Sequence, residues 1–506
     1  MELAEWVFNN TLTYLNTVPK AERKKIGQFF TPAPIAEYMG SLSTNNKATV
    51  HVLDPGAGSG ILSAAIVDEL ICNGVQHIYL DLYENNKNIL PLLRENIAYI
   101  QHTATNCGVI MDYNIIEDNF IIANQLAWSG LMLSKTYDIV IANPPYKKIG
   151  KRAAEASVMN SIVYGQPNLY FLFMAMGAHL LKENGELIYI VPRSFSSGLY
   201  FTAFRNYFFS SMRISNLHLF SSRETIGGGE DKVLQETVIM RAVKSHKYPR
   251  KIEITESPGG NCVPSARYYV DYHTCVKTDH NVFLFFPTCE DDIRVLDFVN
   301  QWPSTLTQLG YRMKTGIVVD FRETEWMRVD EEENVAPLLW AYNFQNYRIE
   351  FPISVAGKPQ YLLNSPDTER LQMKKNNYLL IKRFTSKEEK KRLQCALLFE
   401  DDFAQYESIS TENHLNFITK TSGIMSKEEL YGLFVVLNSN YLDKYFRILN
   451  GSTQVNANEV NSMPFPAYDD IVQIGIRAML ANDLTGVDCD AILEGHFLQF
   501  AIRKAI

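Results

Sequence analysis

The chain has 506 residues and a formal net charge of −8 at pH 7, with 46% hydrophobic residues to supply a core. A chain of this length is expected to form two or three domains. Its opening, Met1-Glu2-Leu3-Ala4-Glu5, is unlike a signal peptide, and the sequence has no uncharged apolar run of membrane-spanning length. Seven scattered cysteines without a Cys-x-x-Cys pair indicate reduced thiols in a cytoplasmic protein and predict no metal site. The acidic charge leaves a nucleic-acid partner open, because phosphate contacts are local and one basic cleft suffices.

Two helices are predicted near the start of the chain. Residues 1–17 form the first, with Phe8 and Leu12 at helical spacing. Thr31 before Pro32 is typical of the start of the second. Helix capping accounts for Thr31, but it does not account for the two aromatic residues that stand directly before it.

A glycine-rich loop follows the first predicted strand. Residues 49–53 form the strand, 54–60 (Asp-Pro-Gly-Ala-Gly-Ser-Gly) the loop and 61–70 a helix. In Rossmann-type nucleotide sites such glycines let the backbone approach a ligand at a helix N-terminus. Asp54 would repel a phosphate. It suits a cationic ligand instead, such as the amino-acid end of S-adenosylmethionine.

Acidic residues stand at the ends of the next two strands. Glu84 follows the second strand at a spacing that suits a bidentate grip on ribose hydroxyls, with a solvated carboxylate as the alternative. After the third strand, Asp118 could accept a hydrogen bond from an adenine amino group, and Phe120 could pack on the ring. Asp112 and Glu117 compete with Asp118 for that role.

A rigid polar turn follows the buried strand predicted at 139–142. This strand ends at Asn143-Pro144-Pro145-Tyr146, because consecutive prolines fix φ and offer no N–H to a β-ladder. The Asn143 side-chain oxygen and the Pro144 carbonyl are two acceptors that could grip both hydrogens of a planar amino group and make its nitrogen nucleophilic. Tyr146 offers a flat face for stacking on the ring that carries the amine. Taken alone, the same four residues are equally compatible with a strand-ending turn.

Basic and aromatic residues lie beyond this turn. Lys147 and Lys148 open a basic loop directly after it. The next buried strand, 185–191, is followed by Phe195 and Phe201, whose rings could stack on a base, although most aromatic residues at such a place are simply packed.

The half of the chain after residue 243 shows no second nucleotide-binding pattern. Its most basic window is 371–393, for which a DNA surface and a solvated helix face are the two interpretations. The segment 450–458 is dense in amide side chains of the kind that read adenine edges, and a polar loop is equally compatible with it. The candidate DNA contacts are Lys382, Arg383, Gln454 and Asn456.

The order and spacing of these motifs are more specific than any one of them. Phe-x-Thr-Pro, Asp-Pro-Gly-x-Gly-x-Gly, the strand-end acids and Asn-Pro-Pro-Tyr, followed by a large C-terminal half, resemble the gamma class of DNA adenine-N6 methyltransferases, which are TaqI-like. Segments 24–32, 343–345, 382–384 and 450–466 look most similar to type II restriction-modification methylases of the PstI/BsuBI group. One departure is Asn86, where the family more often has an acid.

The resemblance implies a role for each matching residue toward S-adenosylmethionine or the target adenine. Phe30, Thr31 and Pro32 would contact the methionine moiety, Asp54, Gly56, Gly58 and Gly60 the amino-acid end, Glu84 the ribose, and Asp118 and Phe120 the cofactor adenine. Asn143, Pro144 and Pro145 would hold the target amine, Tyr146 would stack on the flipped base, Phe195 or Phe201 would stack opposite, and Lys147 and Lys148 would lie near DNA.

The same resemblance implies an α/β fold. A Rossmann-like, S-adenosylmethionine-dependent catalytic domain is expected in residues 1–245, a mixed α+β target-recognition domain in 246–470 and a helical tail in 471–506. The expected substrate is double-stranded DNA, paired in function with a restriction endonuclease in a bacterial cytoplasm. The reaction would be direct methyl transfer to a flipped adenine, because the adenine amine is occupied in the base pair.

Other functions stay open at this point. Cytosine-N4 methylation uses the same amine chemistry, although that family usually has serine in place of Asn143. RNA adenine methylation and protein-glutamine methylation are further alternatives, the latter in shorter chains. A non-catalytic DNA-binding protein with a methylase fold is the alternative from another class.

Overall fold

The structure is a computed structural model that describes residues 3–17, 30–220, 237–259, 261–278, 282–353, 355, 357–386, 388–450, 453–481 and 484–504. Some sequence-based predictions reach outside these ranges: residues 1–2 of the first helix, the segment 24–29 of the N-terminal motif, Lys387 in the basic window, residues 451–452, and residues 482–483 and 505–506 of the helical tail.

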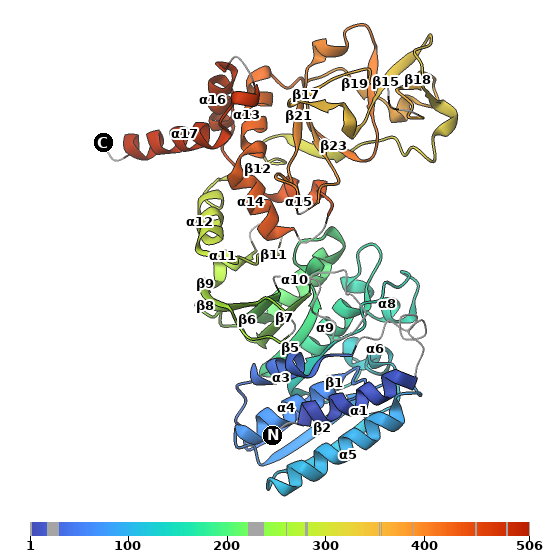
Figure 1. The fold of residues 1–506 in the computed structure, drawn as a ribbon, viewed down its shortest axis with the longest axis vertical. Helices are drawn as coiled ribbons and strands as arrows, with labels where there is room; N and C mark the ends of the chain where they lie inside the picture. Colours follow the sequence, from blue (N-terminus) through green and yellow to red (C-terminus); the bar gives the residue numbers. More distant parts are fainter. Residues whose placement is uncertain are drawn as a thin grey trace. The chain divides into compact units, whose positions relative to one another are not determined.

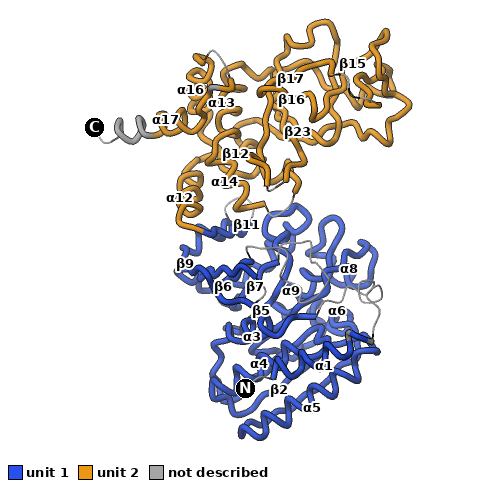
Figure 2. The backbone as a smooth tube through the Cα atoms, viewed as in Figure 1, with its two compact units in different colours: residues 1–288 blue, residues 289–506 orange. Residues whose placement is uncertain are grey.

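The chain forms two compact units, residues 1–288 and 289–506 (Figure 2). The sequence places the first boundary at residue 245, where the alternation of strands and helices ends. The first unit continues further because β8 (Lys251–Ser257) pairs with β6 (Met212–Phe220), and β9 (Ala266–Asp271) pairs with β8. Helices α16 (Tyr468–Met479) and α17 (Cys489–Lys504) lie in the segment for which a separate helical tail was expected, but they pack on helix α13 (Lys427–Asn438) and therefore belong to the second unit.

The first unit is built on one large sheet, a result that confirms the predicted α/β class (Figure 1). Its described strands lie in the order β3-β2-β1-β4-β5-β7-β6-β8-β9. The first five in this order run parallel, and β7 runs antiparallel to both β5 and β6. All six residues of β4 are buried, as expected for a central strand covered on both faces. The remaining bounds are β1 Thr49–Pro55, β2 His77–Tyr83, β3 Ile110–Ile116, β4 Tyr137–Ala142, β5 Leu181–Pro192 and β7 Thr237–Lys244.

Helices of the first unit pack in two groups (Figure 1). In one group α1, α3, α4 and α5 contact one another, and fully buried side chains such as Ile66 and Ile97 join them to the sheet core. In the other group α6, α8 and α10 contact α9. Their bounds are α1 Leu3–Thr17, α3 Ala33–Ser41, α4 Ile61–Cys72, α5 Leu90–Asn106, α6 Phe120–Ala123, α7 Gln125–Trp128, α8 Ala154–Val158, α9 Leu169–Leu180, α10 Thr202–Ser211 and α11 Tyr272–Cys275.

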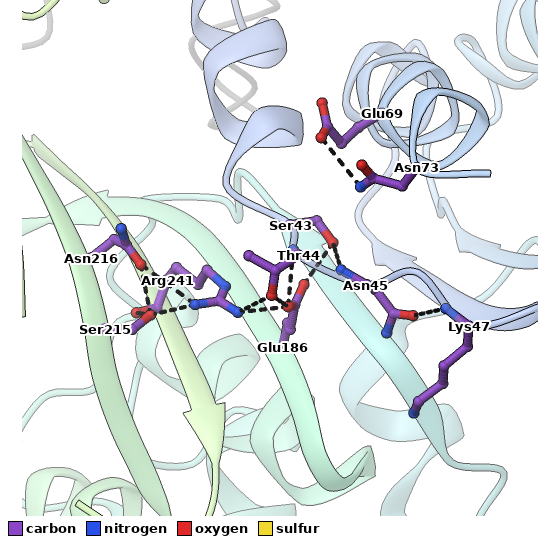
Figure 3. A network of polar contacts seen from close by, with 10 residues as sticks. All are labelled: Ser43, Thr44, Asn45, Lys47, Glu69, Asn73, Glu186, Ser215, Asn216 and Arg241. Carbon is purple, nitrogen blue, oxygen red and sulfur yellow. Dashed lines mark hydrogen bonds and ion pairs between the residues drawn. The ribbon is translucent and has the colours of Figure 1, made fainter. Parts of the chain in front are cut away.

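A buried carboxylate anchors the loop that follows α3 (Figure 3). Glu186 on β5 accepts hydrogen bonds from the Ser43 hydroxyl (2.6 Å), the Thr44 N–H (3.1 Å) and the Thr44 hydroxyl (2.8 Å). Arg241 on β7 pairs with the same carboxylate at 2.6 Å. Burial by itself would raise the pKa of Glu186, but the Arg241 guanidinium and these hydrogen bonds outweigh it and hold the pKa below its ordinary value. The loop is thereby fixed to two strands of the sheet.

The described part of the second unit holds two larger sheets, a small sheet of two strands (304–305 and 464–465) and a group of helices (Figure 1). Helix α13 contacts α14, α16 and α17. The described strand orders are β13-β23-β20-β21-β17-β16 and β14-β18-β15-β22-β19. The strands of these sheets include β15 Val335–Leu339, β19 Met373–Lys374, β20 Tyr378–Lys382, β22 Ser408–Thr411 and β23 Leu415–Lys420. The helices are α12 Glu290–Val299, α14 Asn440–Leu449, α15 Ala457–Ser462, α16 Tyr468–Met479 and α17 Cys489–Lys504, together with α13. The other strands of this unit are β12 Ser304–Thr305, β13 Tyr311–Thr315, β14 Met327–Arg328, β16 Phe344–Gln345, β17 Arg348–Ile349, β18 Tyr361–Leu363, β21 Cys395–Leu398 and β24 Pro464–Phe465. Two short strands of the first unit, β10 Val276–Lys277 and β11 Phe283–Leu284, pair with each other.

The described residues contain neither a membrane-spanning helix nor a cluster of metal ligands. None of the described helices is long and apolar enough to cross a membrane. In the same ranges, no three His, Cys, Asp or Glu side chains gather in a group that could hold a metal ion.

Candidate active site and nucleic-acid interface

A cavity of about 540 Å³ lies at the carboxyl ends of the parallel strands. It is lined by residues that follow β1, β2, β3 and β4, and β1 and β4 are the neighbours at which the strand order reverses. Open α/β sheets bind their ligands at this edge and at this reversal. Among the predicted site residues, the lining contains Phe30, Thr31, Gly56, Gly58, Glu84, Asp118, Phe120, Asn143, Pro144, Pro145 and Lys147.

The glycine loop presents bare backbone to the cavity. Gly56, Gly58 and Gly60 have φ of 115°, 55° and 84°, which favours glycine at each position. A Cβ added at Gly58 would meet no heavy atom within 4 Å, so this part of the loop faces open space. A Cβ at Gly60 would lie 3.1 Å from Leu93 Cδ1 on α5. Gly60 is outside the cavity lining and permits close helix packing instead.

Glu84 is buried beside the glycine loop. Its Oε2 accepts from the Gly58 N–H at 2.9 Å, and its Oε1 accepts from the Asn86 N–H at 2.7 Å. The Asn85 backbone also hydrogen-bonds this carboxylate, and an ionised carboxylate can accept about four hydrogen bonds, so acceptor capacity remains for a ligand hydroxyl. Burial raises the pKa of Glu84. Asn86 takes part through its backbone, a role that does not require the acid that the family more often has there.

Asp54 lies behind the loop, outside the cavity lining. Its side chain is buried, and its Oδ2 accepts a hydrogen bond of 2.7 Å from the Ser63 hydroxyl on α4. Burial raises the pKa of Asp54 to about 7. Its Oδ1 is buried without a hydrogen-bond partner among the described residues, so one acceptor of the carboxylate is unused. Pro32, which was expected to contact the ligand, is also outside the lining and begins α3, its carbonyl accepting from the Ala36 N–H at 3.0 Å.

The third strand ends in a polar turn and a buried ring. The Asp118 carboxylate is exposed and accepts from the Asn119 N–H at 2.6 Å. The Phe120 ring is 2% exposed and packs at 5.2 Å from the rings of both Tyr83 and Phe173. The competitors of Asp118 lie outside the lining, Asp112 against His77 and Glu117 against Arg94.

Asn143 is held by a residue from a distant part of the chain. Its Nδ2 donates to the Thr31 hydroxyl oxygen at 3.0 Å, and Thr31 is 4% exposed. Because the amide nitrogen points toward Thr31, the amide oxygen Oδ1 points away from it. Asn143 itself is half-buried at the cavity wall.

Three aromatic rings, those of Tyr146, Tyr170 and Phe201, are in contact next to the Asn143 turn. The Tyr146 hydroxyl donates to the Ile190 carbonyl at 3.0 Å, and burial raises the pKa of Tyr146 well above its ordinary value. Its ring meets Tyr170 edge-on at 6.2 Å, and Phe201 lies 5.8 Å from Tyr170. Phe195 is fully buried and packs on Phe204 in the core. Its ring is therefore not accessible for stacking on a base. Phe201 is half-buried and stays the candidate.

The basic loop after the turn is tied to the start of α9. Lys147 and Lys148 are exposed, and Lys147 also lines the cavity. The Leu169 N–H donates to the Lys147 carbonyl at 2.9 Å, and Lys148 forms a β-bridge with Asn168. The loop thus presents its charges from a paired backbone.

The second unit brings the two predicted DNA-contacting segments together. Phe384 forms an antiparallel bridge with Gln454, and the Val455 N–H donates to the Arg383 carbonyl at 2.7 Å. Lys382, Arg383, Gln454 and Asn456 are all half-buried. Nearly 70 residues separate these segments in sequence, and strand pairing makes them neighbours.

The basic window is not the solvated helix face that was one of its two interpretations. Its described part forms strands β19 and β20 with connecting turns, and contains no α-helix. Arg392 is fully buried and donates to the Thr385 hydroxyl at 3.0 Å. The window is therefore not one continuous charged face.

Several residues that line the cavity were not predicted from the sequence. Asn85, Lys87 and Asn88 follow Glu84 directly, and this polar run at a strand end was the available signal. Glu155, which accepts from the Asn119 amide at 2.9 Å, gave no signal because it comes from a short helix beyond the basic loop.

Comparisons with known proteins agree with this architecture. A family model described as Eco57I restriction-modification methylase matches residues 69–226. Type II methyltransferase M.PstI of Providencia stuartii is 31% identical over 460 residues, covering 91% of this chain and 90% of its own length. Type II methyltransferase M.BsuBI of Bacillus subtilis is 32% identical over 505 residues, covering 97% of this chain and 98% of its own.

Among solved structures, the type IIL restriction-modification enzyme MmeI in complex with DNA aligns with 95% of this chain and 71% of its own, with a TM-score of 0.51. At 12% identity this likeness concerns the fold alone. These two relatives show the family and confirm the predicted similarity to type II restriction-modification methylases of the PstI/BsuBI group. The chain belongs to the type II methyltransferases of restriction-modification systems, the family of M.PstI and M.BsuBI.

Proposed function

We propose that this protein transfers a methyl group from S-adenosylmethionine to the N6 amine of an adenine flipped out of duplex DNA, at a specific site. The observation that carries the proposal is the Asn143-Pro144-Pro145 turn in the wall of the strand-end cavity, with the Asn143 amide oriented by Thr31. Asparagine in this place, where cytosine-N4 enzymes usually have serine, supports adenine as the target.

The described residues fit S-adenosylmethionine. The bare backbone at Gly58 leaves room for a ligand, the spare lone pairs of Glu84 suit ribose hydroxyls, and Phe120 offers an apolar ring. The unpartnered Oδ1 of Asp54 suits an ammonium group that approaches the loop. When bound, the cofactor supplies an electrophilic methyl group on a sulfonium.

The chain's own residues would prepare the amine. The Asn143 Oδ1 and the Pro144 carbonyl accept the two N6 hydrogens, which directs the nitrogen lone pair toward the cavity and stabilises positive charge that develops on nitrogen. The Tyr146 hydroxyl, anchored on Ile190, fixes the ring on which the adenine would stack. Phe201 stands as the opposing ring.

The family supports a proposal for the DNA partner and the biological role. MmeI is described in complex with DNA, and we propose that the second unit of this chain reads the target sequence. The modification would protect that sequence from a restriction endonuclease of the same specificity.

The test is transfer of tritiated methyl from S-adenosylmethionine to unmodified duplex plasmid, followed by nucleoside analysis. Label in N6-methyladenine is expected. Asn143→Ala should lower transfer by at least about 100-fold, the usual effect of losing one preorganised polar partner, while cofactor affinity measured by calorimetry stays near wild type. Label in cytosine, in RNA only or in protein would overturn the substrate assignment, and full activity of Asn143→Ala would overturn the mechanism.

A further inference from the structure

The turn between β22 and β23 carries a histidine that the proposed function has not used. Two backbone hydrogen bonds tie this turn to other segments: the Glu412 N–H donates to the Leu339 carbonyl (3.0 Å) and the Asn413 N–H to the Val318 carbonyl (2.8 Å). A third closes the turn itself, from the Leu415 N–H to the Glu412 carbonyl (3.0 Å). A Cβ at Gly316 would lie 2.0 Å from the Glu412 carbonyl oxygen, so the backbone just after β13 passes the turn at a distance that only glycine allows. The turn is therefore a rigid platform.

The fully buried carboxylate of Glu412 is hydrogen-bonded to the exposed imidazole of His414 in this turn. Glu412 has no exposed area, its Oε2 accepts from the His414 N–H at 2.8 Å, and its Oε1 contacts His414 Nδ1 at 2.5 Å. The His414 side chain is 53% exposed. Burying a carboxylate is unfavourable unless its hydrogen bonds are satisfied. Here both oxygens orient one histidine, which leaves Nε2 on the far side of the ring.

Around His414 lies a small patch of mixed chemistry, formed by Arg383, Phe384, His414 and Gln454. The Phe384 ring is 42% exposed and lies 5.0 Å from the imidazole. Arg383 donates to the Asn413 carbonyl at 2.9 Å, and its guanidinium lies 5.3 Å from the Phe384 ring centre. Gln454 is bridged to Phe384. A cation, an imidazole and an amide around an exposed ring are the side-chain types that contact bases.

We propose that this patch reads bases of the target duplex, with His414 contacting a base edge through Nε2 and Glu412 acting as its positioning residue. The proposal rests on the proposed function only in taking duplex DNA as the ligand. Exposed phosphate contacts need no fixed orientation, whereas a base edge does, and Glu412 supplies that orientation. This is the reason to favour base reading over backbone contact.

The experiment maps methylated sites on plasmid by modification-sensitive sequencing for the wild type, His414→Ala and Glu412→Gln, with His102→Ala as control for an exposed histidine on α5. We expect His414→Ala to accept substitutions at one base-pair position and to lose about 10-fold or more in discrimination there, as for one good base contact. Glu412→Gln should relax the same position to a smaller extent, and His102→Ala should change nothing.

Binding measured by fluorescence anisotropy, with and without salt, separates the possible failures. Uniform weakening on all sequences, with a salt slope smaller by about one, would make His414 a phosphate contact and overturn base reading. Unchanged site preference and affinity, with an unchanged melting temperature, would overturn the patch. Sequence-preferring binding without methyl transfer would overturn the proposed reaction. The proposal for the patch would then be decided by the affinities of wild type and His414→Ala for different sequences. Absence of duplex binding would overturn both.

Discussion

At the scale of single residues, the contact between Thr31 and Asn143 changes what a motif residue is expected to do. The resemblance assigns Thr31 to the methionine end of the cofactor, and Thr31 does line the cavity. The structure adds that its hydroxyl accepts from the Asn143 amide at 3.0 Å. An asparagine amide can rotate by half a turn and exchange its oxygen with its nitrogen, and this hydrogen bond selects the orientation that presents the oxygen.

Replacing Thr31 distinguishes these two roles. Thr31→Val removes the hydroxyl at nearly constant shape, and we expect kcat to fall about 5- to 10-fold, the value of one net hydrogen bond, with cofactor affinity unchanged. Thr31→Ser should restore kcat because it keeps the hydroxyl. Steady-state kinetics and calorimetry measure the two quantities. A weakened cofactor with normal kcat would place Thr31 at the methionine moiety instead.

At the scale of elements, the site depends on how α3 is attached to the sheet. Thr31 lies just before α3, and the loop after α3 is bound to Glu186 on β5 (Figure 3). Glu186 forms an ion pair with Arg241, whose side chain is only 12% exposed. Removal of one partner leaves the other buried charge uncompensated, which is far more destabilising than loss of an exposed pair.

We therefore expect Glu186→Gln to lower the free energy of unfolding by about 3 kcal/mol. The matched control is Glu117→Gln, which breaks the half-exposed pair with Arg94 and should change stability by less than about 1 kcal/mol. Urea denaturation of both variants measures the difference. Equal effects would show that the Glu186 pair contributes no more than a surface pair.

At the scale of the whole molecule, stability should depend on pH through His218, a buried residue that does not line the cavity. His218 has no exposed area, and its two ring nitrogens meet the hydroxyls of Thr255 (2.8 Å) and Ser257 (2.9 Å). Burial lowers the pKa of His218 from 6.5 to about 4. The folded state therefore holds this ring neutral at pH values where the unfolded chain binds a proton. Its contribution to stability is complete above pH 6.5 and is lost as the pH falls toward 4.

Between pH 6.5 and pH 5 this loss amounts to about 2 kcal/mol. Asp54 acts in the opposite direction, because its raised pKa makes the folded state gain stability as the pH falls below 7. The measurement is therefore the difference in unfolding free energy between wild type and His218→Asn at each pH. That difference should shrink by about 2 kcal/mol from pH 6.5 to pH 5. A difference independent of pH would show that His218 titrates normally.

The sequence by itself determined the α/β class, the glycine loop, the strand-end positions of Glu84, Asp118 and Asn143, and the family. These features are local, since periodicity, glycine and proline act on neighbouring residues and strand ends meet at one edge of a parallel sheet. Only the tertiary structure decided that Phe195 is buried while Phe201 is not, that Asp54 lies behind the loop, and that Thr31 holds Asn143. It also placed β8 and β9 in the first unit and joined Glu412 to His414. Burial and partners depend on chain segments that meet only on folding, and a linear pattern does not contain them.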